Sequence, residues 1–453
     1  MPHPGIPLEK LGFLTIGLFD GDDPGSGHQT TLEIIELGER LGFDSAWVRH
    51  RHLQYGISSP VAILAAASQR TSRIELGTAV IPLGWENPLR LAEDLATVDI
   101  LSGGRLNPGM SVGQPANWDD VKEALYPGTF GAEDFSYRRV ERLLSYVAGE
   151  PATNFSGAIG FEQFSNRVQP HSPGLRKRLW YGGAGLASAR WAGEHGMNFL
   201  TSSVVRAQES EDFAQVQRSH IQAFRAAHPD GEKARVSQGL VVIPTDSATR
   251  AQKAKYEAYV AARTPRTAAP VGPARMMFAR DLLGTSEEIA GMLYAHAGFQ
   301  EVTEVAFALP FTFEQEDYVQ ILTDTAERLG PALGWSRHEL APGLMCRWTR
   351  NCHPDDLRST GGRLRLRHAA GTPTSQAALE NVPPGRGRPC AAGVPGAQAH
   401  ERRWLVLVVG DGPAVDHRAG RRARRRRGGA GLHAHQVAPA RHRLAEVPPR
   451  AAP

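Results

Sequence analysis

Cysteine is scarce in this 453-residue chain, and its three cysteines, Cys346, Cys352 and Cys390, all lie in the last quarter. The first 340 residues therefore have no disulfide framework and no cysteine that could act as a nucleophile. The three cysteines also lack the paired spacing of a zinc site. The sequence predicts no bound metal.

Long apolar runs are absent as well. No stretch of 18 apolar residues occurs, which argues against a helix that spans a membrane. The N-terminus lacks the charged segment, the apolar segment and the cleavage site of a secretory signal. We therefore expect a cytoplasmic protein with no membrane partner.

Lysine is also rare, with six residues, and arginine is concentrated at the C-terminal end. Residues 341–453 contain 20 Arg, no Lys and 7 acidic residues, a balance of +13, whereas the whole chain carries +4. Residues 1–340 therefore carry −9. Only the arginine-rich segment could attract nucleic acid, and blocks of like charge such as 421–427 are more typical of disorder. We expect a disordered, Arg/Pro/Gly-rich tail at 341–453 and no nucleic-acid partner.

Strand-like apolar runs and amphipathic helical runs alternate through residues 1–340. The expected strands are 11–19, 43–48, 73–81, 105–112, 178–182, 197–201, 237–243 and 302–309. The expected helices are 30–41, 60–69, 88–100, 137–147, 186–195, 207–227, 248–262, 286–297 and 314–329. Repeated strand–helix units imply parallel strands joined by crossover helices. Eight strands over this length predict an α/β fold, a closed (β/α)8 TIM barrel with insertions. The alternative is an open doubly wound sheet, but no G-x-G-x-x-G follows the first strand.

The segment WVRHRHLQ, residues 47–54, places two arginines and two histidines directly after the expected strand 43–48. In a barrel of this kind the chemistry lies where strands end and βα loops begin. Because side chains alternate along an extended chain, His50 and His52 should share one side, and Arg49 and Arg51 the other. The alternative is that the arginines are surface groups and one histidine is structural.

Five segments together resemble the bacterial luciferase-like flavin monooxygenase family. They are GFDSAWVRHRH, RIELGTAVIPL, NPLRLAEDLATVDILSGGRLNPGMSVG, RLWYGGAGLASARWAGEHGMNFLT and LLGTSEEIAGMLYAHAGFQEVTEVAFALP, in this order over about residues 10–335. The resemblance implies that residues 1–340 form a TIM-barrel flavin domain. The flavin in this family is usually reduced FMN and sometimes a deazaflavin, and it acts on a small organic substrate.

The glycine-rich loop Gly182, Gly183, Ala184 and Gly185 leads from an expected strand into an expected helix. Unpaired backbone N–H groups and the helix dipole at such a point attract phosphate. The resemblance assigns this loop to the flavin phosphate. Ala184 replaces a serine that many members have, so backbone amides, with help from Ser188, are expected to bind the phosphate.

The resemblance also implies where the flavin ring lies. The segment with Thr78 and Ala79 corresponds to the family segment that contacts the isoalloxazine ring, where a cis peptide bond recurs, here between Ala79 and Val80. Ser111 and Gly113 correspond to positions that flank the same ring.

The site differs from the family pattern at its expected catalytic residues. Many members have Glu-His-His or Asp-His-His where this chain has His50, Arg51 and His52. Arg51 aligns with the first family histidine, often treated as catalytic, and His52 with the second. Since arginine stays protonated at working pH, Arg51 is expected to bind charge and His52 to move protons.

The resemblance thus implies an FMN-dependent monooxygenase that uses dioxygen and reduced FMN, the latter supplied by a flavin reductase or by NAD(P)H. The alternatives are a deazaflavin-dependent dehydrogenase, which moves a hydride without oxygen, and a non-catalytic flavin-binding protein. We also expect a homo-oligomer.

Overall fold

The computed structural model describes residues 7–338. The predictions for the tail 341–453 and for its cysteines lie outside the described residues. Within residues 7–338, no helix combines the length and the hydropathy that crossing a membrane requires.

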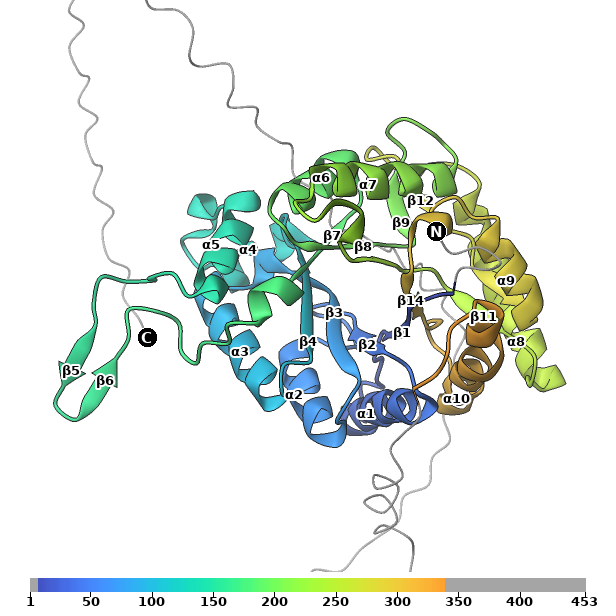
Figure 1. Ribbon diagram of the computed structural model, residues 1–453, viewed down its shortest axis with the longest axis horizontal. Coiled ribbons are helices and arrows are strands. Elements are labelled where there is room, and N and C mark those ends of the chain that lie inside the picture. The colour runs from blue at the N-terminus through green and yellow to red at the C-terminus, as the bar shows by residue number, and fades with distance from the viewer. Residues whose placement is uncertain (1–6, 339–453) are drawn as a thin grey trace, which may run out of the picture. The chain divides into compact units, whose positions relative to one another are not determined.

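Eight parallel strands close into a barrel, and helices surround it (Figure 1). In their order around the barrel they are β1 (Lys10–Thr15), β14 (Glu304–Ala308), β10 (Val236–Gln238), β8 (Asn198–Thr201), β7 (Trp180–Gly183), β4 (Leu106–Ser111), β3 (Glu75–Pro82) and β2 (Ser45–Val48). This closed order confirms the predicted (β/α)8 barrel and contradicts the open-sheet alternative.

The helices of the described chain lie close to the predicted ones. They are α1 (Pro24–Leu41), α2 (Pro60–Arg70), α3 (Pro88–Leu101), α4 (Trp118–Leu125), α5 (Tyr137–Ala148), α6 (Leu186–Glu194), α7 (Phe213–Ala227), α8 (Arg250–Arg263), α9 (Ser286–Tyr294), α10 (Gln315–Asp324) and the short α11 (Gly330–Ala332). The two ends of α1 show how single residues fix where a helix begins and ends. Asp23 accepts a hydrogen bond from the N–H of Ser26, and Gly42 ends the helix at φ +89°, which glycine adopts readily.

Several predicted elements have different bounds in the structure: α1 begins six residues before the predicted helix 30–41, β1 ends four residues before the predicted strand 11–19, and α4 was not predicted. Two further elements show the physical reason. The predicted helix 207–227 begins only at Phe213, because the side chain of Asp212 caps the first turn and accepts from Ala214 N at 2.9 Å. The predicted strand 237–243 is two strands, β10 and β11 (Val242–Pro244). The strand is interrupted at Gly239 and Leu240, although Gly239 N still donates to Thr201 O at 2.8 Å, and β11 then pairs with β13 (Leu282–Gly284).

Insertions extend the barrel. Because β9 (Val204–Arg206) follows β8, its antiparallel pair with β12 (Met276–Phe278) builds up the carboxyl end of the barrel. The hairpin of β5 (Gly157–Ile159) and β6 (Glu162–Phe164) projects away from the helical ring (Figure 1). None of these short strands was predicted, since three-residue strands carry too little periodicity to detect.

Two tryptophans fill the middle of the barrel. Trp47 on β2 and Trp180 on β7 meet edge to face with ring centroids 5.3 Å apart, and both are fully buried. Gly77 makes room for them, since a Cβ at this position would lie 2.1 Å from Cε3 of Trp47. The paired rings separate the amino end of the barrel from its carboxyl end.

A charge network closes the amino end. The guanidinium of Arg235 donates to both oxygens of Glu304, at 2.9 and 2.8 Å, and to Glu75 at 2.9 Å, and it lies 4.8 Å from the Trp180 ring. Lys10 completes the network by donating to Glu75 at 2.6 Å. Burial lowers the pKa of Arg235, but pairing with Glu304 and Glu75 outweighs it and the net direction is upward.

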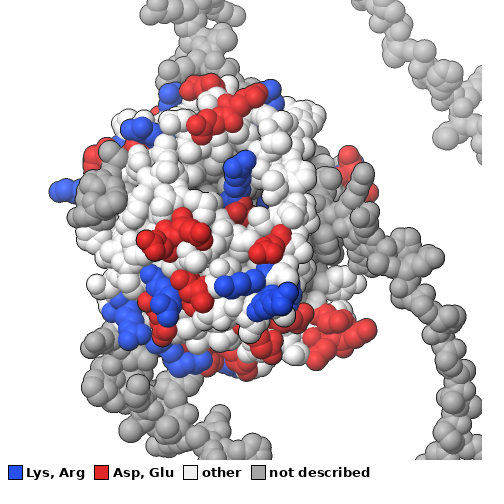
Figure 2. Space-filling view, turned by 90° about the vertical axis from the view of Figure 1, so that its right-hand side faces the viewer, with Lys and Arg blue, Asp and Glu red and all other residues white. Residues whose placement is uncertain are grey.

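Figure 2 shows the face on the side of α8, α9 and α10. Basic and acidic side chains are interspersed there rather than gathered by sign. This face therefore lacks the continuous basic surface that attracts nucleic acid.

We expect Arg235→Met to lower the free energy of unfolding by about 3 kcal/mol, because it leaves Glu304 buried without its cation. Arg90→Met is the matched control, since Arg90 also pairs with two carboxylates, Glu93 and Asp94, but is 65% exposed. Its loss should cost less than about 1 kcal/mol. Urea unfolding of both variants measures the difference, and equal losses would contradict the role of the network.

Candidate active site

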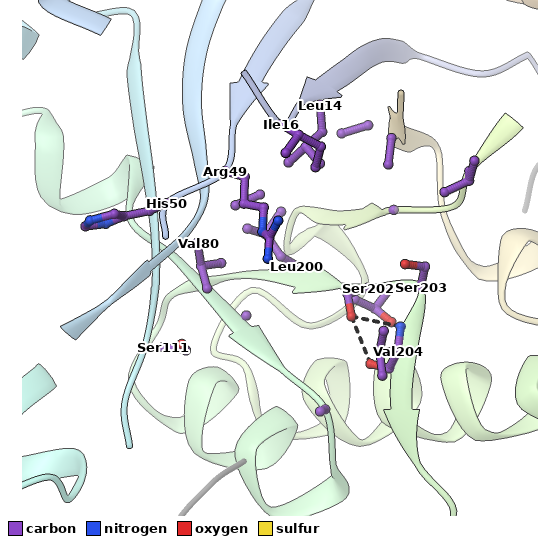
Figure 3. A pocket seen from close by; sticks show the side chains of 18 of the residues that line it. Leu14, Ile16, Arg49, His50, Val80, Ser111, Leu200, Ser202, Ser203 and Val204 are labelled. Carbon is purple, nitrogen blue, oxygen red and sulfur yellow. Dashed lines mark hydrogen bonds between the residues drawn. The ribbon is translucent and has the colours of Figure 1, made fainter. Parts of the chain in front are cut away.

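A cavity of about 250 Å³ opens at the carboxyl end of the barrel (Figure 3). All eight barrel strands, or the residues directly after them, contribute to its lining. The lining combines aliphatic side chains, glycines and serine hydroxyls with four arginines, and no Asp or Glu of the described chain belongs to it. The cavity is thus mostly apolar with an excess of positive charge, and its place is where barrel enzymes carry their chemistry.

The cavity brings together a large part of the predicted site. Its lining includes Arg51, Ala79, Ser111, Gly182, Gly183 and Ala184. The predicted cis peptide bond between Ala79 and Val80 is confirmed. Segments that lie more than 100 residues apart in the sequence therefore meet in one space.

The other predicted residues lie outside this lining. Thr78 ties β3 to β4, since its hydroxyl donates to Gly109 O at 2.7 Å and accepts from Gly109 N at 2.9 Å. The Ser188 hydroxyl donates to Gly185 O at 2.8 Å, inside the first turn of α6. Gly113 follows β4 with φ +148°. In the structure, the hydroxyls of Thr78 and Ser188 form hydrogen bonds with backbone groups of the protein.

The glycine-rich loop packs closely against the cis segment. A Cβ on Gly182 would lie 2.7 Å from Cγ1 of Val80, and a Cβ on Gly183 would lie 2.7 Å from the Ser188 hydroxyl. The N–H of Leu186 donates to Gln208 Oε1 at 3.0 Å. The absence of side chains in this loop lets its backbone approach both the Val80 side chain and the cavity.

The two histidine rings lie side by side, but His50 also lines the main cavity with Arg49 and Arg51, so the strict alternation predicted for this segment does not hold after β2 ends at Val48. The rings of His50 and His52 lie 4.4 Å apart, and His52 stacks on Trp85 at 4.2 Å. His52 borders a second cavity of about 310 Å³, which the loops after β2 and β4 also line. Arg49 and Arg51 border both cavities.

Burial determines the charge state of the histidines. It lowers the pKa of His50 to about 3, with further lowering by His52 and Arg51. It lowers the pKa of His52 to about 4, and Arg51 again contributes. Both rings are therefore neutral at physiological pH. They can donate or accept a hydrogen bond but are weak bases.

Glu86 is a site residue that the sequence reasoning missed. Burial, followed by repulsion from Asp94, raises the pKa of its carboxyl to about 7, although Arg139 opposes the shift. Its Oε1 lies 3.9 Å from His50 Nε2. No motif marks this residue, and it joins the histidines only through the fold.

His50, His52 and Glu86 place their ligand atoms within 4.8 Å of one another, a set that could hold a metal ion. Arg51 lowers the pKa of both histidines by charge repulsion, and a divalent cation would meet the same repulsion. We therefore interpret the cluster as a group that handles protons, and the absence of a metal stays a prediction.

Arg49 was also not among the predicted site residues. Figure 3 shows its side chain directed into the main cavity, between Val80 and Leu200. The alternation that placed Arg49 beside Arg51 was the signal that could have identified it.

Comparison with known proteins adds to this geometry. The sequence model of the family described as luciferase-like monooxygenase matches residues 10–300. Limonene 1,2-monooxygenase from Rhodococcus erythropolis is 34% identical over 164 residues, which cover 34% of this chain and 39% of that relative. F420-dependent glucose-6-phosphate dehydrogenase from Amycolatopsis mediterranei is 27% identical over 185 residues, which cover 39% and 54%. The chain thus matches about half or less of the length of these relatives.

Among solved structures, a type II Baeyer–Villiger monooxygenase in complex with FMN resembles this chain. It is the oxygenating constituent of 3,6-diketocamphane monooxygenase from Pseudomonas putida. The TM-score is 0.53 at 14% identity, over 72% of this chain and 99% of the other. At this identity the likeness shows the fold alone.

The raised pKa of Glu86 predicts how stability responds to pH. Between pH 4.5 and about 7 the folded protein keeps a proton on Glu86 that the unfolded chain releases. This group therefore contributes stability below pH 4.5, and the contribution is lost as the pH rises toward 7. Glu86→Gln should remove that part of the decline. Urea unfolding at intervals from pH 4.5 to 8 measures it, and parallel profiles for the variant and the parent would contradict the assignment.

Proposed function

The chain belongs to the luciferase-like monooxygenase family, and we propose that it is a flavin-dependent monooxygenase that uses reduced FMN and dioxygen on a small organic substrate. One observation carries the proposal. The cavity joins the cis Ala79–Val80 segment to the glycine-rich loop before α6, the two elements expected to hold a flavin ring and its phosphate.

The residues of the cavity fit a flavin. Gly182 lets the loop backbone lie against Val80, where a Cβ would come within 2.7 Å of Cγ1, and the start of a helix such as α6 attracts phosphate. We propose that Gly182, Gly183 and Ala184 hold the phosphate and that Ala79 and Ser111 lie beside the ring. Bound reduced FMN would supply the electrons that activate dioxygen.

The charged residues at the cavity mouth have separate proposed roles. Arg51 presents a fixed cation beside the cavity, where it can stabilise negative charge on a ligand. His52, neutral at working pH, can pass a proton through its ring nitrogens. Glu86, with a pKa near 7, lies 3.9 Å from His50 and can hold a proton near the two histidines. The apolar walls exclude water from the reacting groups.

A deazaflavin-dependent dehydrogenase is the second candidate. The dehydrogenase relative from Amycolatopsis mediterranei, named as F420-dependent, favours it, since its aligned segment is longer than that of the limonene monooxygenase. We favour the monooxygenase because the limonene monooxygenase is 34% identical against 27% for the dehydrogenase, and because the matching family model is described as luciferase-like monooxygenase. A flavin reductase as electron donor and a homo-oligomeric state remain part of the proposal.

The two candidates predict different results with oxygen. Purified full-length protein should bind FMN, and addition of chemically reduced FMN with candidate substrates should consume dioxygen in step with product. An oxygen electrode and mass spectrometry with labelled dioxygen measure both. Substrate oxidation that requires reconstituted deazaflavin and incorporates no oxygen would instead establish the dehydrogenase. Failure to bind either cofactor would favour neither enzyme.

The close packing of Gly182 against Val80 predicts that a side chain at position 182 weakens FMN binding. Gly182→Ala should weaken FMN binding at least tenfold, because the new Cβ would displace Val80 toward the cavity. Gly291→Ala, in α9, is the control, since a Cβ there meets no other atom within 4 Å. Fluorescence titration with FMN measures both variants. Unchanged affinity in Gly182→Ala would remove the loop from the flavin site.

A further inference from the structure

The side chain of Arg49 carries a charge that no described residue neutralises. It leaves the end of β2 and enters the main cavity (Figure 3). Across residues 7–338 its guanidinium has no hydrogen-bond or ion-pair partner, and it lies 5.6 Å from the ring centroid of Phe311. The group is therefore held in place by an aromatic face and not by a carboxylate.

The neighbouring charges do not compensate for Arg49. Arg263 and Arg266 also line the cavity, but Asp281 pairs with both of them, and Arg263 contacts the same Phe311 ring at 5.4 Å. Arg51 adds a further positive charge. Acidic residues are absent from the cavity lining in the described part of the chain. The cavity thus keeps a net positive charge.

Arg49 remains a cation at physiological pH. Burial and the nearby Arg51 lower its pKa to about 10, still well above neutrality. A partly buried cation without a counter-charge is costly, and a bound anion would offset that cost. The planar guanidinium matches a carboxylate, with which it can form two parallel hydrogen bonds.

The phosphate of a flavin is not the anion that the position of Arg49 suits. The proposed phosphate loop follows β7, and β3 and β4 separate β7 from β2 around the barrel. The two anion-binding features therefore belong to different parts of the barrel wall. Val80 of β3 lies between them, and Leu14 of β1 and Leu200 of β8 add further aliphatic surface to the cavity.

We propose that Arg49 binds the carboxylate of the substrate, so that the substrate is a small organic acid with an apolar body. The proposal rests on the proposed function, since it assigns the part of the cavity that a flavin leaves open. The aliphatic wall would contact the body of the acid, and Arg49 would fix its orientation relative to the flavin.

The test uses full-length protein loaded with FMN and matched pairs of ligands. Cyclohexanecarboxylate, benzoate and octanoate are each compared with the corresponding neutral amide by isothermal titration calorimetry at pH 7.5. At least one carboxylate should bind tenfold or more tightly than its amide. Arg49→Met should abolish this preference, Arg49→Lys should keep part of it, and the surface variant Arg90→Met should leave it unchanged.

Three results would overturn the proposal. The first is equal affinity for acids and amides, or no binding of any acid, in the parent protein. The second is a preference that survives in Arg49→Met. The third is a tenfold loss of affinity for reduced FMN in Arg49→Met with an intact acid preference, because the anion would then be the reduced flavin itself. If the protein binds no FMN, the flavin proposal fails, and the same titrations on the cofactor-free protein still decide the role of Arg49.

Discussion

The guanidinium of Arg235 determines at which end of the barrel a ligand can bind. Its pairing with Glu75 and Glu304, under the ring of Trp180, closes the amino end with matched charges. Trp47 then packs on Trp180 and fills the middle. Since both the end and the middle are occupied, the main cavity of the described chain lies above the tryptophans, among the loops that follow the strands. The position of the site is thus a consequence of how the opposite end is filled.

The two ends of the barrel use the same residue type in opposite ways. At the amino end, Arg235 meets two carboxylates of the chain, so its charge contributes to folding. At the carboxyl end, Arg49 meets an aromatic ring and no carboxylate within the described chain. An arginine that pairs with carboxylates of the chain stabilises the fold. An arginine that lies in a cavity without such a carboxylate can still bind the negative charge of a ligand.

The barrel could be predicted from the sequence because each strand–helix unit has its own apolar pattern and end signals, as in α1 with Asp23 and Gly42. Prediction failed where one apolar pattern continued through an interruption of the strand, as at Gly239, or where one cap moved a boundary, as at Asp212. It also missed Glu86, because a lone glutamate in the sequence shows neither its burial nor its approach to His50. The sequence also could not predict that the hydroxyls of Thr78 and Ser188 donate to backbone carbonyls, because these partners are set by the folded structure.

The charge pattern after β2 ties these points together. After β2 the chain reads Arg49, His50, Arg51 and His52. Arg49 and Arg51 both line the main cavity, and burial keeps both histidines neutral. The nearby acid, Glu86, keeps its proton up to about pH 7 and so cannot restore the balance below that pH. Within residues 7–338 the lining of the main cavity contains no acidic side chain, so its positive potential favours a ligand that carries negative charge.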